Sequence, residues 1–295
     1  MYYQKPGLNP GRMKMLINLL KPAALLLVLF VVQACTPEND PPPPKIISLS
    51  GHLVAHWSFD SDVGNEVMDM IDNNYPGTLH GTEKVNGPVQ KAYNFDGLND
   101  FIEINVDTLN PEHKLHLLDK GSISLWFNCD TIPQVDGIAP IFYYGSSDSC
   151  AEMPDAANQG IVIEIGHSPI HQGSKRLYFT VFADGCNYPP LCFDTNFPIE
   201  QDQWYHLVIV IGDNTNNGYI NGFELIDRNY NFGNSSMSLF FSDAVKHDKI
   251  MIGRGFWDAK EVFFDGIIDD IRIYNKDITH EEVNYLFNLR EPSIH

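Results

Sequence analysis

The chain has 295 residues and is acidic, with 38 Asp and Glu residues against 19 Lys and Arg residues and a formal net charge of −19. Such a charge repels nucleic acid and anionic lipid, and so excludes proteins that bind either through basic patches, whereas carboxylates suit hard cations such as Ca²⁺. The length suits one large β domain or two small ones.

The first 34 residues predict a lipoprotein signal peptide. Residues 1–34 carry four basic side chains, no acidic one, and an apolar run at Ala23–Val32 that is too short to span a bilayer, which takes about 20 residues. The run ends in Val32-Gln33-Ala34-Cys35, which resembles the lipobox of bacterial lipoproteins. That resemblance implies cleavage before Cys35 and acylation of Cys35. A plain cleaved signal and an N-terminal membrane helix are the alternatives.

Residues 35–49 predict an extended tether between the lipid and the domain. Pro41–Pro44 fix φ and lack backbone donors, so this stretch cannot join a sheet. Thr36 stands where an Asp commonly retains such lipoproteins in the inner membrane, so we expect an outer-membrane lipoprotein, periplasmic or exposed at the cell surface. The acidic stretch just after Cys35 resembles surface-export signals of Bacteroidetes-type lipoproteins.

Residues 50–291 predict a single all-β domain. Short β-rich runs alternate with clusters of Gly, Asn, Asp and Pro, and apolar residues recur at every second position in Ile123–Phe127 and Asp270–Tyr274. Asn221-Gly222 between two such runs is typical of a hairpin turn. About a dozen short strands with closely spaced turns favour a β-sandwich or jelly roll.

One short helix is predicted at the C-terminal end of the domain. Thr279 and Glu282 have the spacing of a capping box, in which each side chain accepts the other residue's backbone amide. Val283, Leu286 and Phe287 then follow at helical spacing. We expect this helix to pack against the sandwich.

Cysteine usage agrees with export. Beyond Cys35 the chain has four cysteines: Cys129, Cys150, Cys186 and Cys192. An even number in an exported protein predicts two disulfides, and three connectivities are open. The pairing Cys186–Cys192 with Cys129–Cys150 is favoured, because the first pair brackets a short turn. No CxxC spacing is present, which argues against a zinc site.

Seven segments follow one another in order: Leu53–Asp60, Gly77–Leu79, Lys91–Gly97, Gly121–Phe127, Trp204–Val208, Tyr219–Gly222 and Phe264–Asn275. This series resembles the laminin-G-like or concanavalin A-like jelly-roll family of secreted bacterial proteins. The resemblance covers nearly the whole mature chain and implies a concanavalin A-like β-sandwich with a short C-terminal helix. Residues 130–200 depart from the family pattern. Such insertions usually form loops, where binding specificity tends to lie.

The resemblance also implies a structural Ca²⁺ ion, since domains of this type often bind one near an edge of the sandwich. Asp60 ends the first strand and Asp269 lies in the last, and these ends lie close together in the family. Asp69 is a further acidic loop position that matches the family. We expect Asp60, Asp69 and Asp269 to be ligands, with the alternative that each aspartate caps a turn.

Carbohydrate binding is expected from exposed aromatic residues in turn-rich stretches. Lectin-like sites combine an aromatic face that stacks on a pyranose with amide and carboxylate side chains that bind its hydroxyl groups. Trp257 and Tyr188 are the candidates for such a site. Trp57, Trp126 and Trp204 lie in or at the start of predicted strands and are expected in the core.

No catalytic motif is recognisable in the chain. Glucanases of this architecture carry a Glu-x-Asp-x-x-Glu pattern on one strand, which is absent here, and His167 and His171 lack the glutamate and the helix of a metalloprotease. We therefore expect a non-catalytic surface module that binds a glycan or glycoprotein, for adhesion or nutrient capture. The alternatives are a structural or protein-interaction component of a surface assembly and a divergent glycosidase.

Overall fold

The computed structural model describes residues 48–133, 137–149, 157–167, 175–183, 189–244, 247–257 and 260–290. The chain divides into two units, Met1–Lys45 and Ile46–His295, and all described residues belong to the second. The predicted signal peptide, Cys35 and most of the tether lie outside the described residues. Within the part that is described, no helix is long and apolar enough to cross a membrane.

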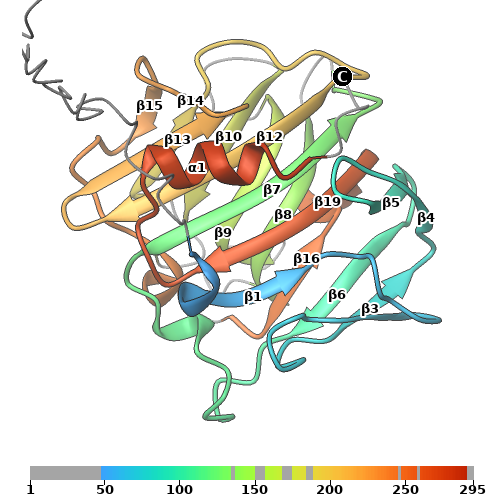
Figure 1. Cartoon of the computed structure of the whole chain (residues 1–295). Helices are drawn as coiled ribbons and strands as arrows, with labels where there is room; N and C mark the ends of the chain where they lie inside the picture. The colour runs from blue at the N-terminus through green and yellow to red at the C-terminus, as the bar shows by residue number, and fades with distance from the viewer. Residues whose placement is uncertain are drawn as a thin grey trace, which may run out of the picture. The chain divides into compact units, whose positions relative to one another are not determined.

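Two antiparallel sheets make up the fold (Figure 1). The first is eight-stranded, and strand β1 pairs with β19 beside its main path. In spatial order it contains β14 (Phe223–Glu224), β13 (Thr215–Ile220), β12 (Trp204–Gly212), β7 (Gly121–Cys129), β19 (Asp265–Tyr274), β5 (Lys91–Asp96) and β4 (Glu83–Asn86), with β1 (Leu53–Trp57) joined to β19.

The second sheet is nine-stranded. In spatial order it contains β15 (Asn229–Phe232), β11 (Leu191–Asp194), β10 (Arg176–Val181), β9 (Ala157–His167), β8 (Gly137–Ser149), β16 (Lys249–Ile252), β6 (Phe101–Asn105), β3 (Gly77–His80) and β2 (Glu66–Val67). A separate hairpin joins β17 (Arg254–Trp257) and β18 (Lys260–Phe263). Short 3₁₀ turns lie at Ser50–His52, Leu115–Leu117 and Phe241–Asp243. The predicted all-β sandwich is therefore confirmed.

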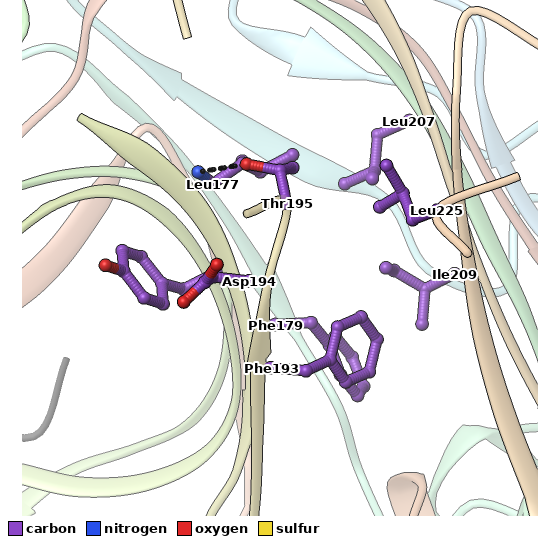
Figure 2. Close-up of a pocket in the computed structure, with 9 residues that line it drawn as sticks. Leu177, Phe179, Phe193, Asp194, Thr195, Leu207, Ile209 and Leu225 are labelled. Atoms are coloured by element: carbon purple, nitrogen blue, oxygen red, sulfur yellow. Dashed lines mark hydrogen bonds between the residues drawn. The ribbon is translucent and has the colours of Figure 1, made fainter. Parts of the chain in front are cut away.

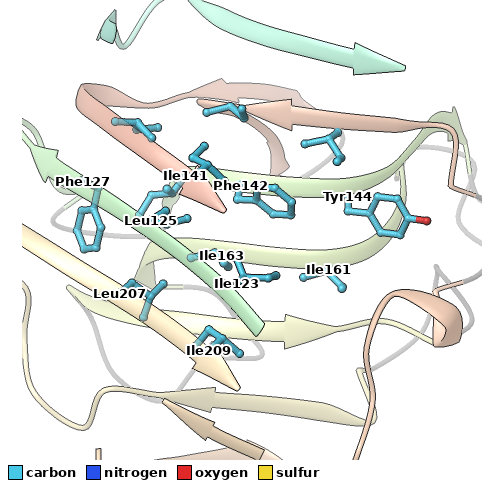
Figure 3. Close-up of a cluster of buried hydrophobic side chains, with 14 of the residues drawn as sticks. Ile123, Leu125, Phe127, Ile141, Phe142, Tyr144, Ile161, Ile163, Leu207 and Ile209 are labelled. Carbon is cyan, nitrogen blue, oxygen red and sulfur yellow. The ribbon is translucent and has the colours of Figure 1, made fainter. Parts of the chain in front are cut away.

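The hydrophobic core lies between the two sheets, as Figure 3 shows. In β7 the period-two pattern directs Ile123, Leu125 and Phe127 into the core, where they are fully buried. Phe142 of β8 and Ile163 of β9 belong to the same core cluster. Each such side chain contributes roughly 1.5–3 kcal/mol by leaving water, so the alternating pattern is what holds the sheets together.

The three tryptophans expected in the core have different environments. Trp57 is fully buried in the core, as predicted. Trp126 is also buried, but it points to the opposite face of its sheet and stacks on Phe287, with ring centroids 5.6 Å apart. Trp204 is only partly buried, so the core prediction is wrong for this residue. A two-residue period fixes which side chains share a face, but not what covers that face.

The predicted C-terminal helix is α1 (His280–Phe287). The Thr279 hydroxyl accepts the Glu282 amide at 3.3 Å and the Glu282 carboxylate accepts the Thr279 amide at 2.8 Å, which confirms the capping box. Val283 and Leu286 pack with Val208 of β12 on the side of the eight-stranded sheet away from the core. Figure 1 shows the helix lying across this sheet.

The predicted disulfides are not formed by the two cysteines that the structure describes, because Cys129 and Cys192 are both free thiols. Cys129 points into the core at the end of β7 and donates to the carbonyl of Thr131, while Cys192 accepts from the Thr180 hydroxyl. Both thiols are enclosed by neighbouring strands, and this burial raises the pKa of each to about 12. Cys150 and Cys186 lie outside the described residues.

Candidate functional site

The side chains of the two aromatic residues predicted for sugar binding lie outside the described part of the structure. Trp257 is the last residue of β17, but its side chain lies outside the described part, as does the whole of Tyr188. The acidic residues predicted for calcium are all described, and their environments differ.

Asp69 has the turn-capping role that was the alternative to metal binding. Its Oδ1 atom accepts the backbone amides of His56 at 2.9 Å and Ile71 at 3.0 Å, and its Oδ2 atom accepts the amide of Tyr75 at 3.2 Å. Both carboxylate oxygens therefore organise the loop that follows β2, and Asp69 ties this loop to strand β1.

Asp269 is a buried acid with an incomplete set of partners. Its Oδ2 atom accepts the Val89 amide at 2.9 Å, whereas its Oδ1 atom is buried and has no hydrogen-bond partner. Burial raises the pKa of Asp269 to about 9, and the charges of Asp270 and Asp60 add to this effect. The effect of the Asp60 charge on this pKa indicates that the residues after β1 lie near Asp269 in the middle of β19.

A bulge in β19 places two successive aspartates at this point. Ile268 and Ile271 both face the core although they are three residues apart, and the register shifts between Asp269 and Arg272. Asp270 lies in the bulge with φ of 48°, and Phe59, which precedes Asp60, has φ of 63°. Left-handed backbone at such residues costs about 1–3 kcal/mol each and often marks functional sites.

Asp270, unlike Asp269, is electrostatically compensated. It accepts from His56 Nε2 at 2.8 Å and pairs with Arg272 Nη2 at 3.0 Å. Burial opposes the ionisation of Asp270, but the hydrogen bonds and charges of His56 and Arg272 outweigh it and hold its pKa below the ordinary value. Among the described aspartates Asp60, Asp269 and Asp270, it is therefore Asp270 that is least available to a cation.

The described residues around Asp269 could supply some of the ligands that a calcium ion needs. Ca²⁺ takes six to eight oxygen ligands, and the unpartnered Oδ1 atom of Asp269 is a suitable donor. Asp60 uses one carboxylate oxygen to accept the Lys91 amide. Within the described residues, no three His, Cys, Asp or Glu side chains come together as a metal cluster. Backbone carbonyls and waters would have to supply the remaining ligands.

A second polar arrangement lies on the face of the nine-stranded sheet that is turned away from the core, which we call the outer face. Asp194 of β11 lies at its centre and is almost completely buried. Its Oδ1 atom accepts from the Asn196 amide at 2.7 Å and from Arg176 at 3.2 Å, and its Oδ2 atom accepts from the side-chain amides of Asn229 at 2.9 Å and Asn231 at 3.2 Å. One carboxylate thus orients three half-buried polar side chains.

Glu164 shares the outer face with Asp194. In the strand register, Tyr178 of β10 lies opposite both of these acids. Glu164 is almost completely buried, and burial raises its pKa to about 8. At neutral pH its carboxyl group therefore retains a proton and can both donate and accept hydrogen bonds.

An aromatic and apolar group lies on the same outer face, on strands β8, β9 and β16. Tyr143, Val162 and Met251 form a buried cluster with the partly exposed Phe182 and Phe256 packed against it. The rings of Tyr143 and Phe256 meet edge to face with centroids 5.6 Å apart. The outer face therefore combines partly exposed aromatic rings with polar side chains. Sequence reasoning missed it, although Glu164 and Asp194 alternate with apolar residues in their strands.

Two other features resemble sites but do not act as such. The cavity in Figure 2 has a volume of about 10 Å³ and lies between the sheets against apolar side chains such as Phe179 and Leu225, so it is a packing gap about the size of one water.

Ser124 Oγ and His206 Nε2 are 2.9 Å apart, which is the spacing of a nucleophile and its base. Both residues are buried, and burial lowers the pKa of His206 to about 3, so this contact is structural.

Comparison with known proteins identifies the superfamily of this fold. Residues 99–284 match the family described as the concanavalin A-like lectin/glucanases superfamily. Comparison with curated protein sequences gives no match.

Among solved structures, the chain is similar to domain 4 of AbnA, an extracellular GH43 arabinanase from Geobacillus stearothermophilus, in complex with arabinotriose. The TM-score is 0.52 at 21% identity, over 81% of this chain and 98% of that one. Trypanosoma rangeli sialidase in complex with the inhibitor DANA gives 0.56 at 15% identity, over 84% of this chain and 34% of the sialidase. The binding domain of botulinum neurotoxin DC, in complex with rat synaptotagmin II, gives 0.58 at 15% identity, over 82% and 52%. At these identities the likeness shows the fold alone.

Proposed function

The chain belongs to the concanavalin A-like lectin/glucanase superfamily, and from that premise we propose that it is a non-catalytic carbohydrate-binding protein whose ligand surface is the outer face. The observation that carries the proposal is the network around Asp194, which holds Arg176, Asn229 and Asn231 in fixed positions on the face of the sheet that also carries the partly exposed rings of Phe182 and Phe256.

The chemistry of these groups matches that of a sugar. Asn229 and Arg176 each donate one hydrogen bond to Asp194. An Asn side chain has two N–H donors and an amide oxygen, and a guanidinium has five N–H donors, so these two side chains keep groups that can meet hydroxyls. Phe182 and Phe256 are partly exposed and can cover the apolar face of a pyranose. The arabinanase domain of similar fold was solved with arabinotriose, which also supports a glycan or glycoprotein as the partner.

A binding role is favoured over hydrolysis by the state of Asp194. Glycosidases need a pair of carboxyl groups, one as acid and one as nucleophile or base. Both oxygens of Asp194 are engaged by four hydrogen bonds from its neighbours, which leaves it poorly suited to attack a sugar carbon or activate water.

Glycan-array screening followed by calorimetric titration of the hits tests this proposal. We expect the Asn229→Ala/Asn231→Ala double variant to bind at least about tenfold more weakly, because two polar contacts are lost. Asn99→Ala, which removes an exposed amide far from this network in sequence, is the matched control and should bind normally. Absence of any glycan ligand, or equal binding by the double variant, would refute the proposal.

A protein-binding role is the second candidate, and it rests on a different surface. Phe223 on the edge strand β14 and the nearby Ile226 are 77% and 81% exposed, and the neurotoxin domain of similar fold was solved with a protein receptor. In that case a Phe223→Ser/Ile226→Ser variant would lose its protein partner while any sugar binding persisted.

We propose further that the protein is exported and anchored to the outer membrane through lipid on Cys35, a proposal supported by the sequence of residues 1–44. When cells are fed labelled palmitate, the label should be incorporated into the parent protein. A Cys35→Ala variant should carry no label and should no longer be recovered in the membrane fraction.

A structural Ca²⁺ ion at Asp60 and Asp269 is the final element of the proposed function. It is supported by the buried, unpartnered Oδ1 atom of Asp269 and by the raised pKa values that burial gives both acids. When bound, the ion would supply positive charge beside Asp60 and Asp269 and would tie the end of β1 to strand β19.

A further inference from the structure

Two histidines from separate loops meet at the start of strand β16. His116 lies in the second 3₁₀ turn and His247 lies two residues before β16, and the centroids of their rings are 6.1 Å apart. The amide of Ser242 donates to the carbonyl of Leu118 at 2.9 Å, which joins the two loops. The His247 ring also packs on Tyr144, with centroids 5.0 Å apart. Contacts other than their own therefore hold the two imidazoles beside each other.

The hydrogen bond of His247 leaves one of its ring nitrogens available to a metal ion. Its Nδ1 atom is 2.7 Å from the carbonyl oxygen of Ala244, and a carbonyl only accepts, so Nδ1 carries the proton and Nε2 carries a lone pair. Burial lowers the pKa of His247, and His116 adds to this effect, whereas the Ala244 carbonyl and the charge of Asp248 oppose it. The ring is therefore neutral at pH 7. Histidines that bind metals usually donate their other N–H to a carbonyl or carboxylate in this way.

The His116 ring is held less firmly than the His247 ring. Its Nδ1 atom is buried and has no hydrogen-bond partner. The Nε2 atoms of both histidines also lack a partner among the described residues, but unlike Nδ1 of His116 they are accessible to solvent. Because no hydrogen bond fixes the His116 ring, it can turn about its soft χ2 torsion and direct Nε2 toward an ion that His247 also binds.

The spacing and the surroundings of this pair suit a transition-metal ion. Two imidazoles on one ion, with metal–nitrogen bonds of about 2.0–2.1 Å, have ring centres about 5–6 Å apart, and the observed spacing is close to this. The negative charge of Asp248 acts on His247 and favours a cation. Imidazole nitrogen suits Cu²⁺, Ni²⁺ and Zn²⁺, whereas Ca²⁺ and Mg²⁺ prefer oxygen. Among the described residues no third His, Cys, Asp or Glu side chain joins the pair, so water fills the remaining positions.

We propose that His116 and His247 form a binding site for a divalent transition-metal ion, with Cu²⁺ bound most tightly. Each histidine contributes its Nε2 atom, and the ion ties the second 3₁₀ turn to the segment before β16. The order of affinity follows from the general preference of nitrogen sites for Cu²⁺ over Ni²⁺ and Zn²⁺. The site uses none of the residues of the outer face and does not depend on carbohydrate binding.

Calorimetric titration of the untagged full chain with CuCl₂ and with ZnCl₂, in excess Ca²⁺, tests the proposal. His247→Asn keeps a donor near the position of Nδ1 and removes Nε2, and His116→Asn removes the other ligand. We expect each substitution to weaken Cu²⁺ binding at least about tenfold. His52→Asn and His80→Asn, at exposed positions, are the matched controls and should bind like the parent.

Two further measurements report on the site itself. Electron paramagnetic resonance of the bound Cu²⁺ should show two imidazole nitrogens in the parent and one in each single variant. Zn²⁺ should raise the thermal unfolding midpoint of the parent more than that of either variant, because an ion that binds only the folded state stabilises it.

The double variant His116→Asn/His247→Asn decides against the proposal if it binds Cu²⁺ as tightly as the parent. Spectra of the parent without coordinated imidazole nitrogen would overturn it as well. Should His247→Asn fail to fold, as judged by thermal unfolding, His116→Asn decides alone, since His116 has no hydrogen bond to lose.

Discussion

Asp269 and His206 are two described residues whose burial strongly opposes their charged forms. Asp269 has one buried oxygen without a partner, and His206 has a buried Nδ1 atom without one. Burial raises the pKa of Asp269 to about 9 and lowers that of His206 to about 3. Both are therefore neutral in the folded protein at pH 7 when no metal is bound, and both make its stability depend on pH.

Asp269 should destabilise the metal-free protein as the pH rises. Its pKa is higher in the folded state than in the unfolded state, so its favourable contribution is complete below about pH 4 and is lost between about pH 4 and 9. The loss amounts to at most about 1.4 kcal/mol per pH unit. Denaturant unfolding in EDTA should show this slope in the parent and a shallower one in Asp269→Asn.

Calcium should stabilise the parent protein more than it stabilises Asp269→Asn. With Ca²⁺ present at pH 8, the parent should gain stability and Asp269→Asn should gain little, because the variant lacks the charged ligand. Asp72→Asn, at an exposed position, serves as the control. Identical pH profiles of parent and Asp269→Asn in EDTA would contradict the buried-acid account, and an equal response to Ca²⁺ would contradict the ion site.

His206 makes stability depend on pH in the opposite direction from Asp269. Its pKa is lower in the folded state, so its contribution is complete above about pH 6.5 and is lost as the pH falls toward 3. The acid-unfolding midpoint of His206→Gln, followed by circular dichroism, should therefore lie at a lower pH than that of the parent. The exposed His52→Gln should not move it, and a midpoint that is unchanged in His206→Gln would count against this assignment.

At the scale of the elements, short-range sequence patterns account for β7 and α1, and packing accounts for what covers them. Period two in β7 directs alternate residues to the core, and α1 then covers the opposite face of the same sheet. Trp126 is consequently buried although it does not point into the core, since Phe287 of α1 stacks on it. The helix is held in place by its apolar residues and by its N-terminal cap.

The contribution of the α1 N-cap to the free energy of unfolding should be measurable by itself. Replacing Thr279 by Ala removes the hydroxyl that accepts the Glu282 amide, and we expect a loss of about 0.5–2 kcal/mol in the free energy of unfolding. Thr108→Ala, at an exposed loop position, is the control. Thr279→Ser should keep most of the stability, because the serine hydroxyl can make the same contact, and a Ser variant as weak as the Ala variant would exclude capping as the cause.

The whole molecule depends on one core that both sheets share. Phe142, Ile163 and Leu207 belong to the same cluster although they come from strands far apart in sequence. Neither sheet can bury its apolar face without the other. The described domain should therefore unfold as one cooperative unit.

Phe142→Ala tests this cooperativity. The substitution leaves a cavity at a fully buried position and should cost about 3–5 kcal/mol. Tryptophan fluorescence and far-ultraviolet circular dichroism should report the same shifted midpoint in denaturant. Leu98→Ala, at a position that is 74% exposed, should change little, and two separate transitions in Phe142→Ala would show that the sheets unfold independently.

Local patterns in the sequence predict the elements and the class of fold, because their signals lie within a few neighbouring residues. Alternation marked β7, Thr279 and Glu282 marked the start of α1, and the order of the family segments predicted the sandwich. It also predicted that Asp60 and Asp269 lie near each other, since the resemblance pairs the first strand with the last.

Strand pairing and packing settle which polar residues share a site. Asp194 and Asn231 are 37 residues apart and meet because of strand pairing, which no local pattern encodes. The β19 bulge buries Asp269 beside Asp270. The pleat of β7 directs the Cys129 thiol into the core, where it is a free thiol and not part of a disulfide. Whether a given polar group is compensated depends on partners and solvent access, and these exist only once the sheets have packed.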